Sequence, residues 1–163
     1  MIYIPFVPNK VYGQTFEWAQ RRPDVIPWPI REDDYTGYFR LLASCWEEPG
    51  NTVIVEHDML PANNVVLRML VCRQPWCTSP YRGSPNKNEP DLIDGLGCVK
   101  FSAELKRSEP YLMRVVSEIA EPGLPAKIWK RLDVRIAGEL RLRGYAPHTH
   151  ERSTHLHYER EGT

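Results

Sequence analysis

Thr52-Val53-Ile54-Val55-Glu56-His57-Asp58-Met59-Leu60-Pro61 is the stretch that decides the fold. Its consecutive β-branched residues, 53 to 55, indicate a short strand that is buried on both faces. Ionisable residues follow this strand at once. Because ligands of open α/β sheets bind beyond the carboxyl ends of the strands, we expect Glu56 and Asp58 to project into a binding crevice. Proline suits the first helical turn, so Pro61 predicts a helix from Ala62 to about Met69.

Strand and helix patterns alternate along the rest of the chain, which is typical of an α/β protein. The segment from Arg73 to Tyr81 contains two prolines and is expected to be a loop. Further strands are predicted at 2–7, 25–30 and 96–102, and helices at 15–22, 35–46, 111–119 and 128–142.

Length and composition predict one soluble domain spanning residues 1–163. Lys plus Arg equals Asp plus Glu at 21 each, so net charge gives no long-range attraction to nucleic acid or anionic membranes. No apolar run approaches the roughly 20 residues of a membrane-spanning helix. The apolar start, residues 1–8, lacks a basic flank and contains prolines, so we expect a cytoplasmic protein.

The four cysteines are Cys45, Cys72, Cys77 and Cys98. Without a secretory signal they are expected to be reduced thiols rather than a disulfide framework. Cys72 and Cys77 have four residues between them, which is the loose end of zinc-knuckle spacing, and no second matching pair follows. Core or loop thiols are therefore favoured.

Four of the five histidines lie in the C-terminal tail: His148, His150, His155 and His157. In a strand, His155 and His157 would point to the same side, because they flank a single residue. Such a pair can ligate a metal ion, or it can belong to a polar edge strand.

Several of these pieces, in this order, resemble a compact nucleotide-sugar glycosyltransferase of the GT-A fold, similar to small phage and actinobacterial glycosyltransferase-like sequences. The resemblance rests on the Glu-His-Asp stretch, a Trp-Cys-x-x-Pro-Tyr loop at 76–81, a Leu-Gly-Cys strand at 96–98 and a Trp-x-x-Leu-Asp helix at 129–133. It implies a single-domain three-layer sandwich with a central mixed, mostly parallel sheet, reduced and Rossmann-like. The donor-binding half would be about 1–100, and the acceptor part 101–163.

The same resemblance implies a divalent metal, Mn²⁺ or Mg²⁺, and a nucleoside-diphosphate sugar donor, UDP-linked by expectation. Charge that develops on the departing diphosphate is stabilised by such an ion. Asp58 and His155 are the expected metal ligands, with His150 and His157 as further candidates. By resemblance, the donor-binding residues are Glu56, His57, Pro5 and Asp34.

An inverting transferase needs a carboxylate to remove the proton of the acceptor hydroxyl. The resemblance assigns this catalytic role to Asp133, although a plain exposed helix acid explains it almost equally well. The acceptor is taken to be a hydroxyl, with a hydroxymethylated base in DNA as one case, contacted by Trp76 and Tyr81. Basic residues outnumber acidic ones between 100 and 143, which allows a basic face, while a solvated amphipathic helix is the alternative.

Two other functions stay open at this point. One is a non-catalytic zinc-containing binding module, built on the tail histidines with Cys72 and Cys77. The other is a metal-dependent hydrolase that arranges Glu56, His57, Asp58 and His155 around an activated water, although no HExxH motif is present. The transferase hypothesis requires Asp58 and at least one of His150, His155 and His157 to converge on one position.

Overall fold

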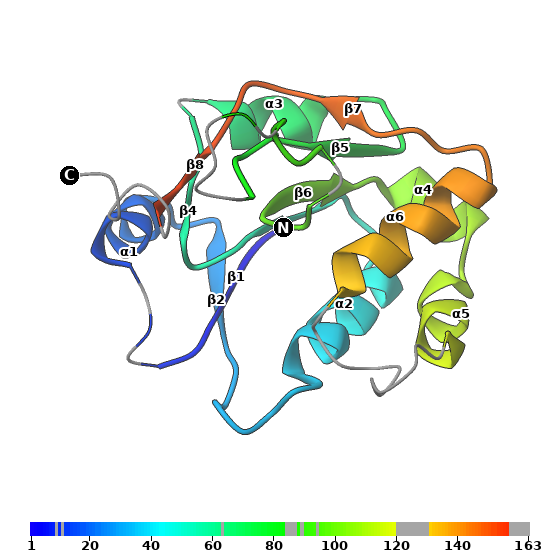
Figure 1. Cartoon of the computed structure of the whole chain (residues 1–163), viewed down its shortest axis with the longest axis horizontal. Coiled ribbons are helices and arrows are strands. Elements are labelled where there is room, and N and C mark those ends of the chain that lie inside the picture. The colour runs from blue at the N-terminus through cyan, green and yellow to red at the C-terminus, as the bar shows by residue number, and fades with distance from the viewer. Residues whose placement is uncertain are drawn as a thin grey trace.

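The computed structural model describes residues 1–8, 10, 12–62, 64–83, 88, 90–93, 95–119 and 131–156. A six-stranded sheet in the order β2-β1-β3-β6-β5-β7 forms its centre (Figure 1). Both β2 and β3 run parallel to β1, and β7 runs parallel to β5, whereas β6 is antiparallel to its two neighbours. The strands are β1 (Ile2–Phe6), β2 (Val25–Pro29), β3 (Thr52–Val55), β5 (Trp76–Thr78), β6 (Cys98–Phe101) and β7 (His148–Thr149).

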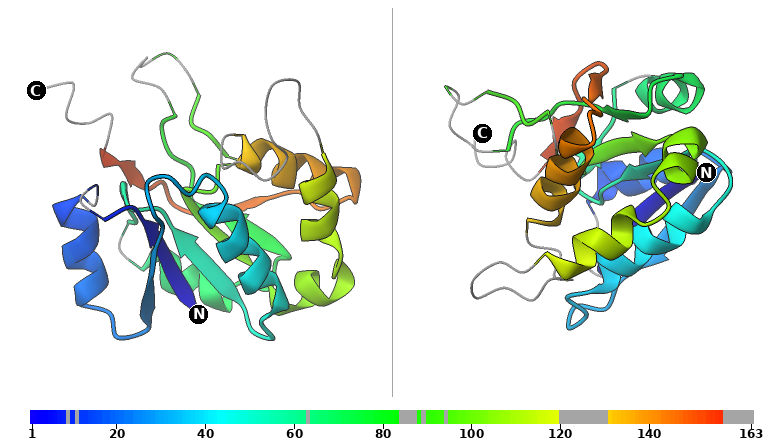
Figure 2. Two further views of the ribbon diagram at one scale, coloured as in Figure 1. Left: turned by 90° about the horizontal axis from the view of Figure 1, so that it is seen from below. Right: turned by 90° about the vertical axis from the view of Figure 1, so that its right-hand side faces the viewer.

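Helices cover both faces of this sheet, because alternate side chains of its buried strands point to opposite sides. Ile54 packs with the helices α2 (Gly37–Glu47), α4 (Ala103–Ser108), α5 (Leu112–Glu118) and α6 (Leu132–Leu142). Val53 and Val55 pack with α3 (Val65–Val71) and, at its edge, α1 (Gly13–Gln20). The right-hand view of Figure 2 shows the sheet between α3 and α2. The predicted three-layer α/β fold with a mixed sheet is confirmed.

A second, two-stranded sheet joins the Glu56-His57-Asp58 stretch to the C-terminal tail. Its strands are β4 (Met59–Leu60) and β8 (Thr154–His155), which pair antiparallel with Met59 opposite His155. The backbone N–H of Leu156 also donates to the carbonyl of Asp58 at 2.8 Å. Residues 154–156 are therefore fixed beside the residues that follow β3.

Two local predictions were wrong. The helix expected at Ala62 begins at Val65, because β4 occupies 59–60 and Asn64 has a left-handed backbone with φ of 64°. The segment expected to be a loop contains β5, since its prolines bracket the strand instead of interrupting it. Residues 120–130, including Trp129, and His157 lie outside the described residues. No helix in the described part of the chain is long and apolar enough to cross a membrane.

Candidate active site

A cleft of about 530 Å³ lies beyond the carboxyl ends of β1, β2 and β3. The sheet order places β2 and β3 on opposite sides of β1, and such a reversal opens a crevice where ligands of α/β proteins bind. All the residues expected to contact the donor line this cleft, as does Asp58. They are Pro5, Asp34, Glu56 and His57.

Asp58 meets His155 in this region. The Nε2 atom of His155 lies 2.9 Å from the Oδ2 atom of Asp58, although 97 residues separate them. The other ring nitrogen, Nδ1, lies 3.0 Å from the carbonyl oxygen of Arg82 and therefore donates to it, which sets the ring orientation. Of the tail histidines expected as metal ligands, His155 is the one that the structure brings to Asp58.

Asp58 and His155 shift the pKa of each other in opposite directions. Burial by itself would raise the pKa of Asp58, but the hydrogen bond and charge of His155 outweigh it, and the pKa is lowered. Burial would lower the pKa of His155, but Asp58 reverses this effect and the pKa is raised. Each residue thus favours the charged form of the other.

A cation fits this arrangement by its donor atoms. The Oδ1 atom of Asp58 is buried and has no hydrogen-bond partner among the described residues. Buried polar atoms are nearly always satisfied, so an unpaired carboxylate oxygen is a candidate to bind a ligand. A carboxylate and an imidazole suit Mn²⁺, which would take the place of the His155 proton.

The pKa of Glu56 is shifted in the opposite direction from that of Asp58, two residues away. Burial is the largest cause that raises the pKa of Glu56 to about 7, and repulsion from the Asp58 carboxylate adds to it. Its backbone N–H donates to the carbonyl of Gly97 at 2.8 Å, which fixes the turn after β3. Two neighbouring carboxyl groups with pKa values driven apart are suited to different roles, one as an anion and one as a proton carrier.

Asp133 lies in a smaller pocket, of about 220 Å³, that shares Tyr38 and Glu56 with the cleft. It sits in the first turn of α6, where its Oδ1 atom accepts the N–H of Val134 at 2.8 Å. The expected catalytic carboxylate therefore stands next to the expected donor site.

The two aromatic residues expected to contact an acceptor occupy different environments. Tyr81 lines the Asp133 pocket and packs edge-on against His155, with ring centroids 5.3 Å apart. Trp76 is fully buried in the core, and its indole N–H donates to the carbonyl of Tyr145 at 3.3 Å. Because the core cluster encloses its ring, Trp76 does not present a face to an acceptor.

The basic residues expected near the acceptor are also dispersed. Lys100 and Lys106 are buried. Arg143 forms ion pairs with Glu109 and Glu139. In the described part of the 100–143 segment, these side chains therefore do not add to a basic face.

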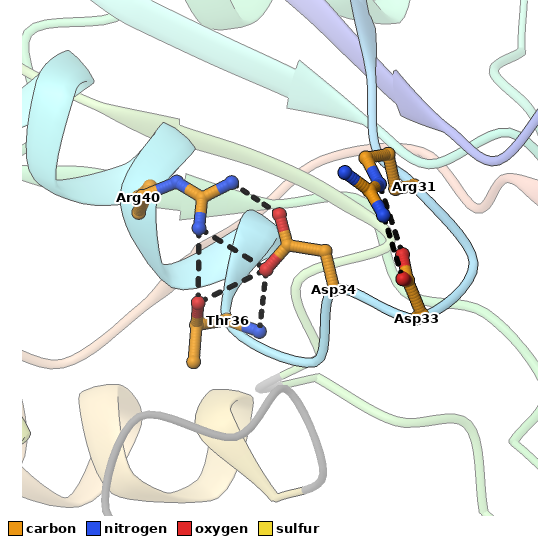
Figure 3. A network of polar contacts seen from close by, with 5 residues as sticks. All are labelled: Arg31, Asp33, Asp34, Thr36 and Arg40. Carbon is orange, nitrogen blue, oxygen red and sulfur yellow. Dashed lines mark hydrogen bonds and ion pairs between the residues drawn. The ribbon is translucent and has the colours of Figure 1, made fainter.

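Asp34 belongs to a polar network in the loop before α2 (Figure 3). Its carboxylate accepts the backbone N–H of Thr36 at 3.2 Å and the Thr36 hydroxyl at 3.0 Å, and it pairs with Arg40. Beside it, Arg31 pairs with Asp33 at 2.7 Å. Asp34 thus shapes the cleft wall with its carboxylate already engaged.

The other expected tail ligand, His150, lies in a separate cluster with Cys72, Cys77 and His148. Sequence reasoning included His148 only among the tail histidines of the zinc-module alternative, although the His-x-His spacing at 148 and 150 repeats that at 155 and 157. It also missed the cleft-lining residues Lys10, Arg31 and Tyr38, for which the sequence offers no distinguishing pattern.

No protein-family model and no curated protein matches this chain. Among solved structures, it is similar to the crystal structure of a glycosyltransferase involved in the glycosylation of the major capsid of PBCV-1. That likeness has a TM-score of 0.47 at 10% identity and covers 92% of this chain and 81% of the other. A likeness at this level does not identify an activity, which has to come from the residues of the site.

Proposed function

We propose that this chain is a metal-dependent glycosyltransferase, which moves a sugar from a nucleoside-diphosphate donor, UDP-linked, to an acceptor hydroxyl. The observation that carries the proposal is the contact between Asp58 and His155 at the strand-end cleft, with one carboxylate oxygen of Asp58 unpaired. A cleft at this edge of a sheet suits a nucleotide, and its acids suit a cation.

In this proposal the diphosphate lies in the cleft beside Asp58 and His155. Mn²⁺ or Mg²⁺ held by these two residues would supply electrostatic stabilisation of the negative charge on the leaving diphosphate. Lys10 and Arg31 line the same cleft and now pair with Glu32 and Asp33. Exchange of these exposed ion pairs for phosphate contacts costs little, because each is worth only about 1 kcal/mol or less.

Asp133 is the proposed general base. It takes the proton of the acceptor hydroxyl while that oxygen bonds to the anomeric carbon and the bond from this carbon to the diphosphate breaks. Its position next to Glu56 and Tyr81 supports this assignment. The acceptor is proposed only as a hydroxyl: a hydroxymethylated DNA base remains one to assay, although the burial of Trp76 removes the expected stacking partner.

Ligand-induced stabilisation tests the donor site. A ligand at 100 times its Kd adds about 2.7 kcal/mol to the free energy of unfolding, and each kcal/mol raises the Tm of a chain of this size by about 2–4 °C. UDP with Mn²⁺ should therefore raise the Tm of the wild type by several degrees, and D58N should remove most of the shift. The matched control is D24N, an exposed acid at the opposite end of β2, which should retain it. A full shift in D58N would refute the metal assignment.

A metal-dependent hydrolase is the second candidate, favoured by one observation. Glu56, with its pKa raised to about 7, could remove a proton from water as readily as from a sugar acceptor. The two functions separate in an assay of UDP release from a UDP-sugar with and without added acceptors. Release that no acceptor accelerates and that E56Q abolishes would favour the hydrolase.

A further inference from the structure

A second cluster of candidate metal ligands lies at the other end of the sheet from the β1–β2 pair. It consists of Cys72, Cys77, His148 and His150, whose ligand atoms all lie within 4.8 Å of one another. Cys72 follows the last residue of α3, Cys77 is in β5, and the histidines come from β7 and the residue after it. Figure 1 shows α3, β5 and β7 side by side.

The strand register explains why these four side chains meet. Cys77 and His148 are direct partners in the parallel pair of β5 and β7, so their side chains share a face of the sheet. The backbone N–H of His150 donates to the carbonyl of Thr78 at 2.9 Å, which continues the pairing and returns His150 to the face of His148. This is the face covered by α3, whose C-terminus delivers Cys72.

Two contacts and one unpartnered atom indicate that a ligand belongs among these residues. The Sγ atom of Cys72 lies 3.6 Å from the Nδ1 atom of His148. The two imidazole rings are nearly perpendicular, with centroids 4.8 Å apart. The Nε2 atom of His150 is buried and, among the described residues, has no hydrogen-bond partner. An unsatisfied buried nitrogen on an imidazole of this cluster is accounted for if it donates its lone pair to a metal ion.

Lys100 holds the backbone on one side of the cluster. Its side chain is fully buried, and its Nζ atom donates to the carbonyls of Cys72 and Gln74 at 2.9 and 2.6 Å. In the part of the chain that the structure describes, no carboxylate pairs with this ammonium. Backbone oxygens hold this ammonium instead, and the two hydrogen bonds fix the position of Cys72 in the cluster.

We propose that Cys72, Cys77, His148 and His150 bind one structural Zn²⁺ ion. Two sulfur and two nitrogen ligands in a closed arrangement are the donor set of tetrahedral structural zinc sites. Binding releases two thiol protons, so that the ion and its two thiolates are neutral together. The ligand atoms need to move inward by about 1 Å to reach zinc–ligand distances of about 2.0–2.3 Å.

The zinc ion fastens the tail to the body of the protein. Between the cluster and His155, Glu151 of the tail pairs with Arg68 and its carbonyl accepts the hydroxyl of Ser79. The hydroxyls of Ser79 and Ser153 form a further hydrogen bond. The strands β7 and β8 have only two residues each, so their backbone hydrogen bonds hold the tail weakly. Metal coordination at 148 and 150 would hold it more firmly and would limit the positions that His155 can reach. The inference does not depend on the proposed enzymatic activity.

Metal analysis of the purified full-length chain, produced in zinc-supplemented medium and freed of any affinity tag, tests the proposal. We expect about one zinc per chain in the wild type, and less than about a tenth of that in C77S and H150Q. The matched control is C45A, which removes an equally buried thiol from α2 on the opposite face and should retain the ion. A wild type without zinc, or H150Q with full zinc content, would overturn the proposal.

Reconstitution with Co²⁺ provides a readout that does not rest on the folding of variants. The refilled wild type should show thiolate-to-cobalt charge-transfer absorption and the visible bands of a tetrahedral site. Octahedral, weakly coloured cobalt would refute the sulfur ligation. A disulfide between Cys72 and Cys77 in freshly isolated, zinc-free protein would refute it as well. Neither measurement involves UDP or turnover, so both are separate from the test of the cleft.

Discussion

The tail contributes histidines to two places that differ in chemistry. At the strand-end cleft, His155 meets the carboxylate of Asp58, in a site that opens to solvent and offers oxygen and nitrogen donors. At the β5–β7 edge, His150 and His148 meet two thiols in a cluster of four candidate ligands, of which Cys77 is buried and His148 is exposed. Hard, exchangeable cations suit the first set of donors and tightly held zinc suits the second. The tail can therefore contribute a ligand to the proposed catalytic site through His155 and ligands to a structural metal site through His148 and His150.

The largest expected effect is the fall in thermal stability when the proposed zinc ion is removed. A zinc-specific chelator should lower the Tm of the wild type by more than 10 °C, because structural zinc sites carry on the order of 10 kcal/mol of apparent binding free energy. Differential scanning fluorimetry before and after chelation, with zinc added back as the reversal step, measures this change. In C77S, the chelator should have no further effect. An unchanged wild-type Tm would contradict the proposal that the Cys/His cluster holds a structural zinc ion.

The general base gives the next effect. D133N should lower the rate of sugar transfer by about 10²- to 10⁴-fold, the usual contribution of general base catalysis. Zinc content and the Tm shift with UDP and Mn²⁺ should both remain at wild-type values, because Asp133 belongs to neither ligand set. Single-turnover assays with saturating donor measure the rate. Transfer at the wild-type rate would return Asp133 to the role of a plain helix acid.

A pair of histidine variants should separate the sites directly. H155Q should lose most of the Tm shift with UDP and Mn²⁺, a loss of about 2 kcal/mol of ligand stabilisation, while it keeps its zinc. H150Q should show the opposite result: it should lose its zinc and keep the Tm shift with UDP and Mn²⁺. Metal analysis and thermal shift on the same two preparations give all four results. If both variants lose both properties, the tail acts as one site instead of two.

The smallest effect concerns the stretch between the sites. Arg68 on α3 pairs with Glu151 at 2.7 Å, and about half of each side chain is exposed. Exposed pairs of this kind contribute about 0.2–1 kcal/mol, so R68A should shift the urea midpoint only slightly and leave both metal sites unchanged. The control is R114A, which removes a similarly exposed pair on α5, away from the tail. A loss of zinc in R68A would show that this pair, too, positions the cluster.

Local sequence patterns predicted the strand-end cleft well. Val53 to Val55 form a fully buried strand, as expected of uninterrupted β-branched residues, and the acids after it reach the crevice. These features depend on a few consecutive residues and on a general property of α/β sheets. The α/β class likewise followed from local strand and helix patterns, whereas the three-layer arrangement was implied by the resemblance to GT-A glycosyltransferases.

Long-range pairing was beyond the reach of those patterns. Which histidine meets Asp58 depends on the register of two-residue strands, in which Met59 lies opposite His155. The proximity of Cys77 to His148 similarly depends on one parallel pairing across 71 residues of chain, and nothing local encodes it. Trp76 was misassigned because neighbouring prolines suggested a loop, whereas the strand between them places the ring in the core.

The separation of 97 residues between Asp58 and His155 matters for biosynthesis. A ribosome that adds about 5–20 residues per second needs about 5–20 s to pass from one to the other. During that interval the nascent chain carries β1, β2, β3 and their acids, but it lacks the imidazole that completes the cation site. The cleft itself is lined by residues 5–58 and needs no part of the tail, but the proposed cation site would be completed only when the tail emerges.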